Sequence, residues 1–421
     1  MSNALEHPGA PASIEETGLD PGLLTDLALK TLYFAGDVRG DELSRRLALP
    51  LQVTSTILSV LRREKLCMPT GGSSVSVGGL NYALTALGLE RAASVLSMNG
   101  YVGPAPVPLA DYIDLVRRQS VHDIEITREA IEGSLVNLVL EQRTLDLIGQ
   151  AVSSKRAVLL YGGSGNGKST AAEDLGRAFP GTILIPHAVE VMHQIIRVFD
   201  PSTHEPIEGN AATRGNSRMV DRRWQPIRRP IVLTGGELAS SHLELVLDPV
   251  HKTYEAPIQM KANGGLLVID DFGRQQLDAA YLVNRWIVPL EKGVDNLSLH
   301  NGASFHSPFD VVPIFVTNMQ PADLADEAFL RRIRYKIEIP PPNLDLFIEI
   351  LKRECAANEM AYDESAAHHL VEEHFVKPGR QMRGCHPRDI VEAIAATDRY
   401  QGREPALTTD AIDDACANYF V

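Results

Sequence analysis

The chain has 421 residues, of which 44% are hydrophobic and 22% are charged. This composition is typical of a folded globular protein, so it excludes wholesale disorder, and the length suggests about two to four domains. The 40 Lys and Arg residues are outnumbered by 54 Asp and Glu residues, which gives a formal net charge of −14. Such an acidic surface repels the phosphate backbone, so broad nucleic-acid binding is disfavoured unless positive charge is concentrated locally.

Cysteine usage and the lack of apolar targeting segments indicate the compartment. The chain has four cysteines and no CxxC pair: Cys67, Cys355, Cys385 and Cys416. So few cysteines predict a reducing compartment rather than a disulfide scaffold. Residues 1–16 lack the apolar core of a signal peptide, and no run reaches the roughly 18–20 apolar residues that span a bilayer. We therefore expect a cytoplasmic protein without membrane insertion.

The N-terminal part is predicted to be a small domain between two irregular segments. Residues 1–18 are rich in Pro, Ala, Ser and Glu and predict a disordered tail. Within residues 19–98, the pattern predicts helices at 21–36, 40–49, 52–65 and 86–97, with a β-hairpin whose strands lie at 75–77 and 81–85. This order is typical of a winged helix-turn-helix domain. Residues 99–120 contain a proline-rich stretch and predict a linker.

Two interpretations of this domain stay open, DNA binding and protein docking or dimerisation. The third helix would read DNA, and it offers Gln52, Thr54, Ser55, Thr56, Ser59, Arg62 and Arg63. However, residues 20–98 contain eight Lys or Arg residues against seven acidic ones, a balance far from that of a basic DNA-binding domain. The charge argument therefore favours a protein-docking module.

The strongest motif follows a predicted helical stretch at 127–148 and a short apolar strand at 158–161. It matches GxxxxGK[ST] and consists of Gly162, Gly163, Ser164, Gly165, Asn166, Gly167, Lys168, Ser169 and Thr170. Glycines let the backbone turn its N–H groups onto a triphosphate, and the positive end of the next helix faces the same anion. Lys168 is expected to reach the β- and γ-phosphates and Ser169 to bind Mg²⁺. The motif predicts an ATP site.

A second motif is expected beside the first. Residues 265–269 are entirely apolar, which indicates a strand buried on both faces of a parallel sheet, and Asp270 and Asp271 follow it. The carboxyl ends of such strands form the ligand-binding edge of the sheet. We expect Asp270 to hold Mg²⁺ and Asp271 to orient and deprotonate the attacking water.

With these motifs, residues 120–421 resemble the AAA+ ATPase superfamily. The resemblance implies an α/β fold: a P-loop NTPase core of three αβα layers at 121–341, followed by a helical lid at 342–421. Within the lid, helices are predicted at 343–360, 364–375, 387–400 and 408–420. The resemblance also implies ATP and Mg²⁺ as cofactors, a hexamer-like homo-oligomeric ring and an unidentified client protein.

The same resemblance assigns roles to further residues. Asn318 ends an apolar strand and matches the sensor 1 position, which helps to place the lytic water. Arg332, with Arg331 as second choice, matches the arginine finger that acts on a neighbouring subunit, although a surface ion pair is the alternative. Arg388 resembles sensor 2, the lid residue that contacts the nucleotide.

The sequence departs from the family pattern at two places. Asp271 stands where the family usually has Glu, and its shorter side chain makes slow, switch-like hydrolysis plausible. An insertion at about 201–262 separates the expected second core strand, 182–186, and its helix, 188–199, from the third strand. The insertion has a cluster of arginines around Trp224: Arg214, Arg218, Arg222, Arg223, Arg228 and Arg229. This cluster is compatible with nucleic-acid contact, with a subunit interface or with a solvated loop.

Predicted hairpins at 243–260 and 296–305 resemble those of MoxR-like AAA+ members. His368, His369 and His374 lie on one predicted lid helix, but without an HExxH motif they predict no zinc site. Two functions therefore compete. The first is an ATP hydrolase that remodels a protein partner, and the second is a slow ATP-dependent regulatory switch whose winged helix binds DNA.

Overall fold

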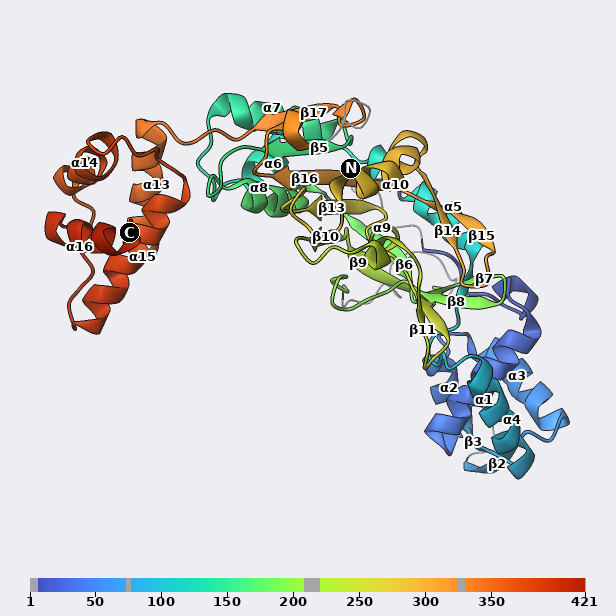
Figure 1. The fold of residues 1–421 in the computed structure, drawn as a ribbon. Helices are drawn as coiled ribbons and strands as arrows, with labels where there is room; N and C mark the ends of the chain where they lie inside the picture. Colours follow the sequence, from blue (N-terminus) through green and yellow to red (C-terminus); the bar gives the residue numbers. More distant parts are fainter. Residues whose placement is uncertain (1–6, 73–76, 208–219, 325–329, 421) are drawn as a thin grey trace.

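The computed structural model describes residues 7–72, 77–207, 220–324 and 330–420. Figure 1 shows three parts in chain order: helices of the N-terminal part at one end, a mixed α/β part in the middle, and helices of the C-terminal part at the other end. Within the described ranges, no helix has both the length and the apolarity that crossing a bilayer requires.

The N-terminal part contains four helices and a small sheet, close to the predicted order. Its helices are α1 (Pro21–Ala35), α2 (Gly40–Arg46), α3 (Leu51–Arg63) and α4 (Ala86–Met98). Strands β1 (Val38–Arg39), β2 (Cys67–Gly72) and β3 (Leu80–Leu84) form an antiparallel sheet in the order β1-β3-β2. The first strand of the described hairpin is β2, in which Cys67 pairs with Leu84, whereas most of the strand predicted at 75–77 falls on residues that the structure does not describe. Residues 73–76 lie outside the described part.

The segments predicted to be a tail and a linker are packed in their described parts. Gly9 forms a β-bridge with Val220, and Thr17, in a 3-10 helix at Glu15–Thr17, is completely buried. In the other segment, β4 (Val107–Pro108) pairs with a later strand, and α5 (Leu109–Arg118) buries Tyr112. Proline content therefore misled the linker prediction, since the prolines flank buried apolar residues.

The central part is built on a five-stranded parallel sheet with the order β10-β13-β16-β5-β17. The strands are β5 (Val158–Tyr161), β10 (Ile231–Thr234), β13 (Gly265–Ile269), β16 (Val311–Thr317) and β17 (Tyr335–Glu338). Every residue of β13 and β16 is buried, as expected for strands covered on both faces.

Alternating side chains of these strands pack against helices on opposite faces, giving three layers. Val158 and Leu160 face one core, which includes α7 (Gln142–Ser153) and α8 (Lys168–Asp174) and lies near α6 (Arg128–Ser134). Leu159 faces the other core, which includes Trp286 of α10 (Ala279–Lys292). The mixed α/β class and the αβα layering are thus present.

The strand expected to be second in the core, residues 182–186, is not part of the parallel five-stranded sheet. β6 (Thr182–Pro186) pairs antiparallel with β9 (Trp224–Arg228), and β10 takes the edge position of the core sheet beside β13. The helix expected at 188–199 was also wrong, because β7 (Ala188–Val191) and β8 (Gln194–Arg197) form a hairpin there. Its two loop residues, Met192 and His193, have φ of 52° and 65°, which fits a two-residue hairpin turn with positive φ at both central positions.

This hairpin joins a second five-stranded sheet in the order β11-β12-β8-β7-β4. Strands β11 (Val246–Asp248) and β12 (Thr253–Glu255) form the hairpin predicted at 243–260, which continues into α9 (Ile258–Lys261). The second predicted hairpin is β14 (Val294–Ser298) with β15 (Ser304–Pro308), and the short helix α11 (Pro321–Leu324) follows β16.

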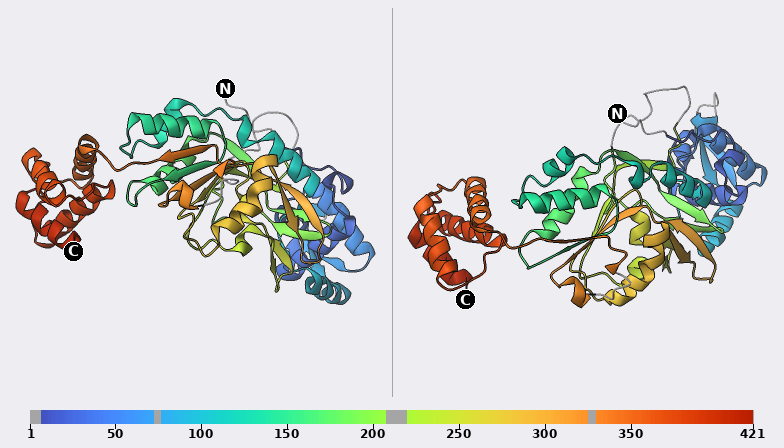
Figure 2. Two further views of the ribbon diagram at one scale, coloured as in Figure 1. Left: turned by 45° about the horizontal axis from the view of Figure 1, so that its top comes forward. Right: turned by 90° about the horizontal axis from the view of Figure 1, so that it is seen from above.

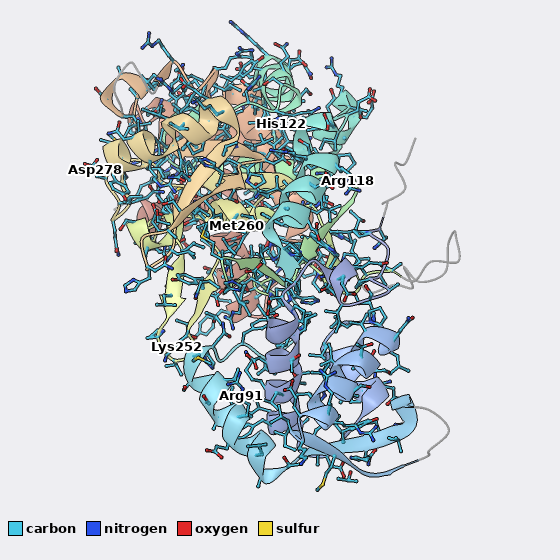
Figure 3. All side chains as sticks on the ribbon, turned by 90° about the vertical axis from the view of Figure 1, so that its right-hand side faces the viewer. Arg91, Arg118, His122, Lys252, Met260 and Asp278 are labelled. Carbon is cyan, nitrogen blue, oxygen red and sulfur yellow. The ribbon has the colours of Figure 1, made fainter. Side chains whose placement is uncertain are left out.

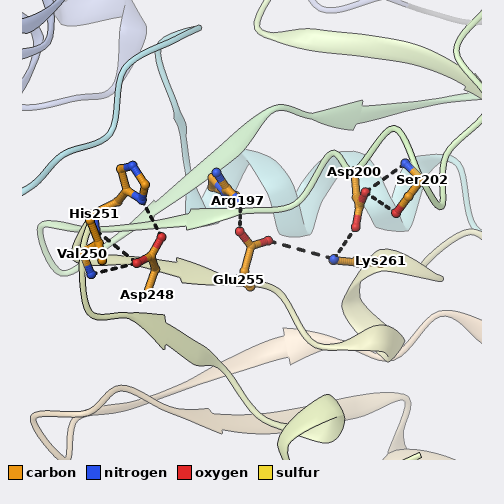
Figure 4. A network of polar contacts seen from close by, with 8 residues as sticks. All are labelled: Arg197, Asp200, Ser202, Asp248, Val250, His251, Glu255 and Lys261. Carbon is orange, nitrogen blue, oxygen red and sulfur yellow. Dashed lines mark hydrogen bonds and ion pairs between the residues drawn. The ribbon is translucent and has the colours of Figure 1, made fainter. Parts of the chain in front are cut away.

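Figure 4 shows a polar network across this second sheet. Arg197 pairs with Glu255, and Lys261 bridges Glu255 to Asp200, whose carboxylate lies 2.7 Å from Lys261 Nζ. Burial alone would raise the pKa of Asp200, but hydrogen bonds from Lys261 and Ser202 outweigh it and hold the pKa below its ordinary value. The network fixes the base of the β11–β12 hairpin to β8.

The tip of the same hairpin touches the N-terminal part. Figure 3 shows Lys252 beside the end of α4, where its ammonium donates to the carbonyl of Ser97. The backbone N–H of Gly100 donates to the carbonyl of His251 at 2.7 Å. A hydrogen bond from His251 lowers the pKa of Asp248, which closes the turn, to about 2.

The C-terminal part is helical, as Figure 2 shows from two directions. Its elements are α13 (Leu344–Ala357), α14 (Glu364–Val371), a π-helical segment (Glu372–Val376), α15 (Cys385–Tyr400) and α16 (Thr409–Tyr419). They pack around their own apolar core, which includes Phe347, Leu370 and Ile394. The four predicted helices are present with small shifts at their ends.

Replacing Gly265 with alanine is expected to destabilise the core sheet by about 1–3 kcal/mol, the usual cost of overpacking. A Cβ at Gly265 would lie 2.1 Å from the carbonyl oxygen of Pro230, which accepts a hydrogen bond from Leu266 N. Denaturant unfolding measures the loss. The control is Gly236→Ala, because a Cβ there meets nothing within 4 Å. Equal stability of the two variants would contradict this account.

Candidate nucleotide-binding site

The predicted strand–loop–helix motif is present as β5, the loop at 162–167 and α8. Gly162, Gly165 and Gly167 have φ of 135°, 80° and 84°, which side-chain-bearing residues rarely adopt. A Cβ at Gly162 would lie 2.5 Å from the carbonyl oxygen of Ile339. The loop conformation therefore depends on these glycines, and it leaves backbone groups accessible for a ligand.

Lys168 begins α8, and its side chain is held in the interior. The residue is only 5% exposed. Its Nζ donates to the carbonyl of Gly163 at 2.8 Å and to Oδ1 of Asn318 at 2.6 Å. Burial lowers the pKa of Lys168, while the nearby Asp270 and Asp271 act in the opposite direction. The structure thus brings together Lys168 and Asn318, which lie 150 positions apart.

The paired carboxylates follow β13 directly. Asp270 N donates to the carbonyl of Thr234 on β10 at 2.8 Å, which fixes the chain at the strand end. Asp271 N donates to Oδ1 of Asp270 at 2.8 Å, and Asp271 has φ of 49°. A left-handed conformation at a residue other than glycine carries strain of order 1 kcal/mol and is concentrated at functional sites. The turn keeps both acids at the edge where the loop lies.

These groups line one cavity of about 470 Å³. Its wall includes the loop, Ser169, Asp270, Asp271 and Asn318, together with Arg388 and other residues of the C-terminal part. The C-terminal part touches the loop directly, because Cys385 N donates to the carbonyl of Gly165 at 2.8 Å. The cavity therefore lies between the central sheet and the C-terminal helices.

The sequence did not predict one wall of this cavity. The helical stretch expected at 127–148 is interrupted between α6 and α7, and residues 137–141 line the cavity together with Leu346 and Ile350 of α13. The signal that could have shown the break is Gly133-Ser134, a pair that favours the end of a helix. Leu138, Val139 and Leu140 make part of this wall apolar beside the loop at 162–167.

Arg388 lines the cavity but pairs with its own neighbour. Its Nη2 lies 3.2 Å from Oδ1 of Asp389, and this hydrogen bond raises the pKa of Arg388. Asp389 also accepts from the hydroxyl of Tyr419 at 2.7 Å. Arg388 is 55% exposed, so this ion pair faces solvent.

Arg331 and Arg332 lie away from this cavity. They precede β17, whose first residue pairs with Val158 at the start of β5, so they are at the opposite edge of the sheet. Arg332 Nη2 lies 2.8 Å from Oε1 of Glu291. They line another cavity of about 720 Å³ that is rich in positive charge, with Lys155, Arg156, Lys292 and Arg334. Within one chain the structure does not bring them to Lys168.

The arginine cluster of the insertion does not form one surface in its described part. Arg223 is buried and pairs with Asp221, and Arg229 donates to the carbonyls of Pro180, Gln119 and Gly264. Arg214 and Arg218 lie outside the described residues, while Arg222 and Arg228 are exposed. Trp224 is buried in β9, so the nucleic-acid interpretation, which needed its ring for stacking, was wrong for this residue.

The surface of α3 offers less for DNA recognition than the sequence suggested. Thr54 is fully buried. The hydroxyls of Thr54, Ser55, Thr56 and Ser59 each donate to the carbonyl four positions earlier in the helix. Arg62 and Arg63 are exposed at the end of the helix.

One described family matches part of the chain. A family described as a domain of unknown function (DUF8689) matches residues 343–418, the C-terminal helices. No curated protein matches the chain.

Three solved structures are similar to this chain, each at low identity and with a TM-score below 0.5. NtrX from Brucella abortus, in complex with ADP, is 13% identical with a TM-score of 0.41; the match covers 67% of this chain and 56% of NtrX. A point mutant of RuvB from Thermotoga maritima is 12% identical with a TM-score of 0.40, and the match covers 66% of this chain and 70% of the RuvB chain. RuvB of the same organism, titled a Holliday junction branch migration motor, is 12% identical with a TM-score of 0.37, and the match covers 66% of this chain and 70% of RuvB. The chain is a mixed α/β protein with a parallel five-stranded sheet.

Proposed function

We propose that this protein binds and hydrolyses ATP with Mg²⁺, as an AAA+ type ring oligomer that remodels a protein partner. The observation that carries the proposal is the buried Lys168 ammonium, held between Gly163 and Asn318 in a cavity that Asp270 and Asp271 also line. A glycine loop, a fixed ammonium and two carboxylates at the carboxyl edge of a parallel sheet are the groups that phosphoryl transfer requires.

The donor set fits the nucleotide and its metal ion. Gly162, Gly165 and Gly167 leave the loop free of side chains that would fill the phosphate site. Lys168 neutralises the β- and γ-phosphates, while the Ser169 hydroxyl and Asp270 supply the hard oxygen ligands that Mg²⁺ prefers. Bound Mg²⁺ supplies charge neutralisation at the phosphate oxygens.

The attacking water is assigned to two side chains. Asp271 accepts its proton and Asn318 orients it, since both lie at strand ends that meet at this edge. Asp271 is one methylene shorter than the usual glutamate, so we expect slow turnover. Arg388 and the contact of Cys385 with Gly165 connect the nucleotide to the angle of the helical lid.

The ring arrangement explains the position of Arg332. At the opposite edge of the sheet it cannot reach its own nucleotide, but a heterologous interface brings this edge against the cavity of the next subunit. In this proposal Arg332 exchanges Glu291 for the neighbour's γ-phosphate, with Arg331 as the second choice. The winged helix at 19–98 then docks the client protein.

ATP hydrolysis per subunit is expected to rise with protein concentration as rings form. Arg332→Ala is expected to lose activity while it still binds ATP, and so is Asp271→Asn. An equimolar mixture of the two variants recovers activity, because about a quarter of its interfaces pair an intact Asp271 with an intact Arg332.

Steady-state phosphate release across a dilution series measures both effects. Arg331→Ala is the comparison, with a smaller expected loss. Constant activity from monomer to oligomer, or a mixture as inactive as its components, would refute the arrangement in trans. ATP binding within one subunit is tested separately, with a Lys168→Ala variant.

A further inference from the structure

Two histidines and an aspartate meet on the surface of the C-terminal part, away from the nucleotide cavity. His369 lies on α14, His374 on the π-helical segment that continues it, and Asp413 on α16. Oδ1 of Asp413 lies 2.8 Å from Nε2 of His369 and 2.7 Å from Nε2 of His374. One carboxylate oxygen is thus shared by two imidazoles from a neighbouring helix.

One of the two histidines, His374, lies on a π-helical turn. Positions five apart in a regular α-helix point about 140° away from each other, so a regular helix would separate the histidines. Here Lys377 N donates to the carbonyl of Glu372 at 3.0 Å, and Arg380 N donates to that of Phe375 at 2.8 Å. Such turns are rare and are frequently found at functional sites. The backbone therefore departs from α-helix in the segment that carries His374.

We propose that His369, His374 and Asp413 form a binding site for a divalent transition-metal ion, with Zn²⁺ as the occupant. Two imidazole nitrogens and one carboxylate oxygen are a donor set that Zn²⁺ accepts, with water completing a tetrahedron. Bound Zn²⁺ takes the two Nε2 atoms in their deprotonated state, so each ring carries its proton on Nδ1.

The geometry requires only small movements. The ligand atoms of the three residues all lie within 4.8 Å of one another. A tetrahedral zinc ion with bonds near 2.1 Å needs ligand separations of about 3.4 Å. The two nitrogen–oxygen distances therefore open by about 0.6–0.7 Å, and the widest separation in the cluster closes by up to about 1.4 Å. Asp413 has room to move because it is 52% exposed.

The site would link two helices of the lid. His369 and His374 hold α14 and the π-helical segment, while Asp413 holds α16, so metal binding cross-links elements that otherwise meet through apolar contacts. A hydrogen bond of 2.7 Å from Arg380 to the carbonyl of His374 already fixes the backbone on one side. The open fourth position leaves room for a water molecule.

Titration of the nucleotide-free, full-length protein with Zn²⁺ against a chromogenic chelator tests the proposal. We expect one equivalent to bind in the wild type. His374→Ala and Asp413→Asn are expected to weaken this binding by at least about 10-fold, the lower range seen even for residues that only support ligands. With Co²⁺ in place of Zn²⁺, visible d–d absorption of a low-coordinate ion is expected in the wild type and is lost in both variants.

His368→Ala is the matched control, since His368 is an exposed neighbour on the same helix and outside the cluster. It is expected to keep the wild-type Zn²⁺ affinity and the Co²⁺ spectrum. Thermal melts of all variants without metal check that they are folded. Absence of saturable binding to the wild type, or equal affinity in His374→Ala, would overturn the proposal, and neither outcome depends on ATP hydrolysis.

Discussion

Lys168→Ala is expected to lower the rate of ATP hydrolysis by at least about 100-fold, the usual cost of removing one fixed group that stabilises a transition-state charge. The ammonium is held by Gly163 and Asn318, so it is already in place before ATP arrives. Arg353 and Arg388 also line the cavity, but both belong to the C-terminal helices rather than to the loop at 162–167. Removing Lys168 leaves the loop without its own cation.

Phosphate release under saturating Mg²⁺ and ATP measures this loss, and a fluorescent ATP analogue separates binding from turnover. Lys352→Ala is the control, because Lys352 is exposed on α13 next to Arg353, which lines the cavity, but does not line the cavity itself. It removes the same charge and should retain full activity. If Lys168→Ala hydrolysed ATP at the wild-type rate with an unchanged melting temperature, the proposed ATP site would be wrong.

The groups around this cavity differ in how far the sequence predicts them. The loop at 162–167 and the Asp270–Asp271 pair were predictable because each motif is local: a buried strand, then polar residues at its end. Asn318 was found in the same way, and in the structure its Oδ1 accepts a hydrogen bond from Lys168. Residues 137–141 could not be predicted by a local motif, since they reach the cavity only because the helical stretch is interrupted between α6 and α7.

Strand pairing around the insertion was harder to predict from the sequence. Residues 182–186 and 231–234 are both apolar, and nothing in either run says which one pairs with β13. The partners are set by contacts far apart in the chain: β10 meets β13, while β6 meets β9. The π-helical turn was missed for a related reason, because α-helical periodicity sends His369 and His374 to different faces.

Replacing Asp221 with alanine is expected to destabilise the central part by about 3–5 kcal/mol, because it leaves a buried charge without its partner. Arg223 and Asp221 are 4% and 2% exposed. The guanidinium of Arg223 also donates to the carbonyls of Thr17 at 3.0 Å and Pro106 at 3.4 Å. The pair therefore joins three segments, the N-terminal residues, the stretch before α5 and the insertion.

Trp224 follows this pair directly and is buried, so its fluorescence reports on the same region. Urea unfolding is therefore measured in a Trp286→Phe background, where Trp224 is the one remaining tryptophan of the two in the chain. Arg222→Ala, an exposed neighbour, is expected to change the free energy of unfolding by less than about 0.5 kcal/mol. The double variant Asp221→Leu/Arg223→Met should lose less than the sum of its single variants, since it leaves neither charge buried alone. Additive losses, or a cost for Asp221→Ala as small as that for Arg222→Ala, would show that the ion pair does not hold these three segments together.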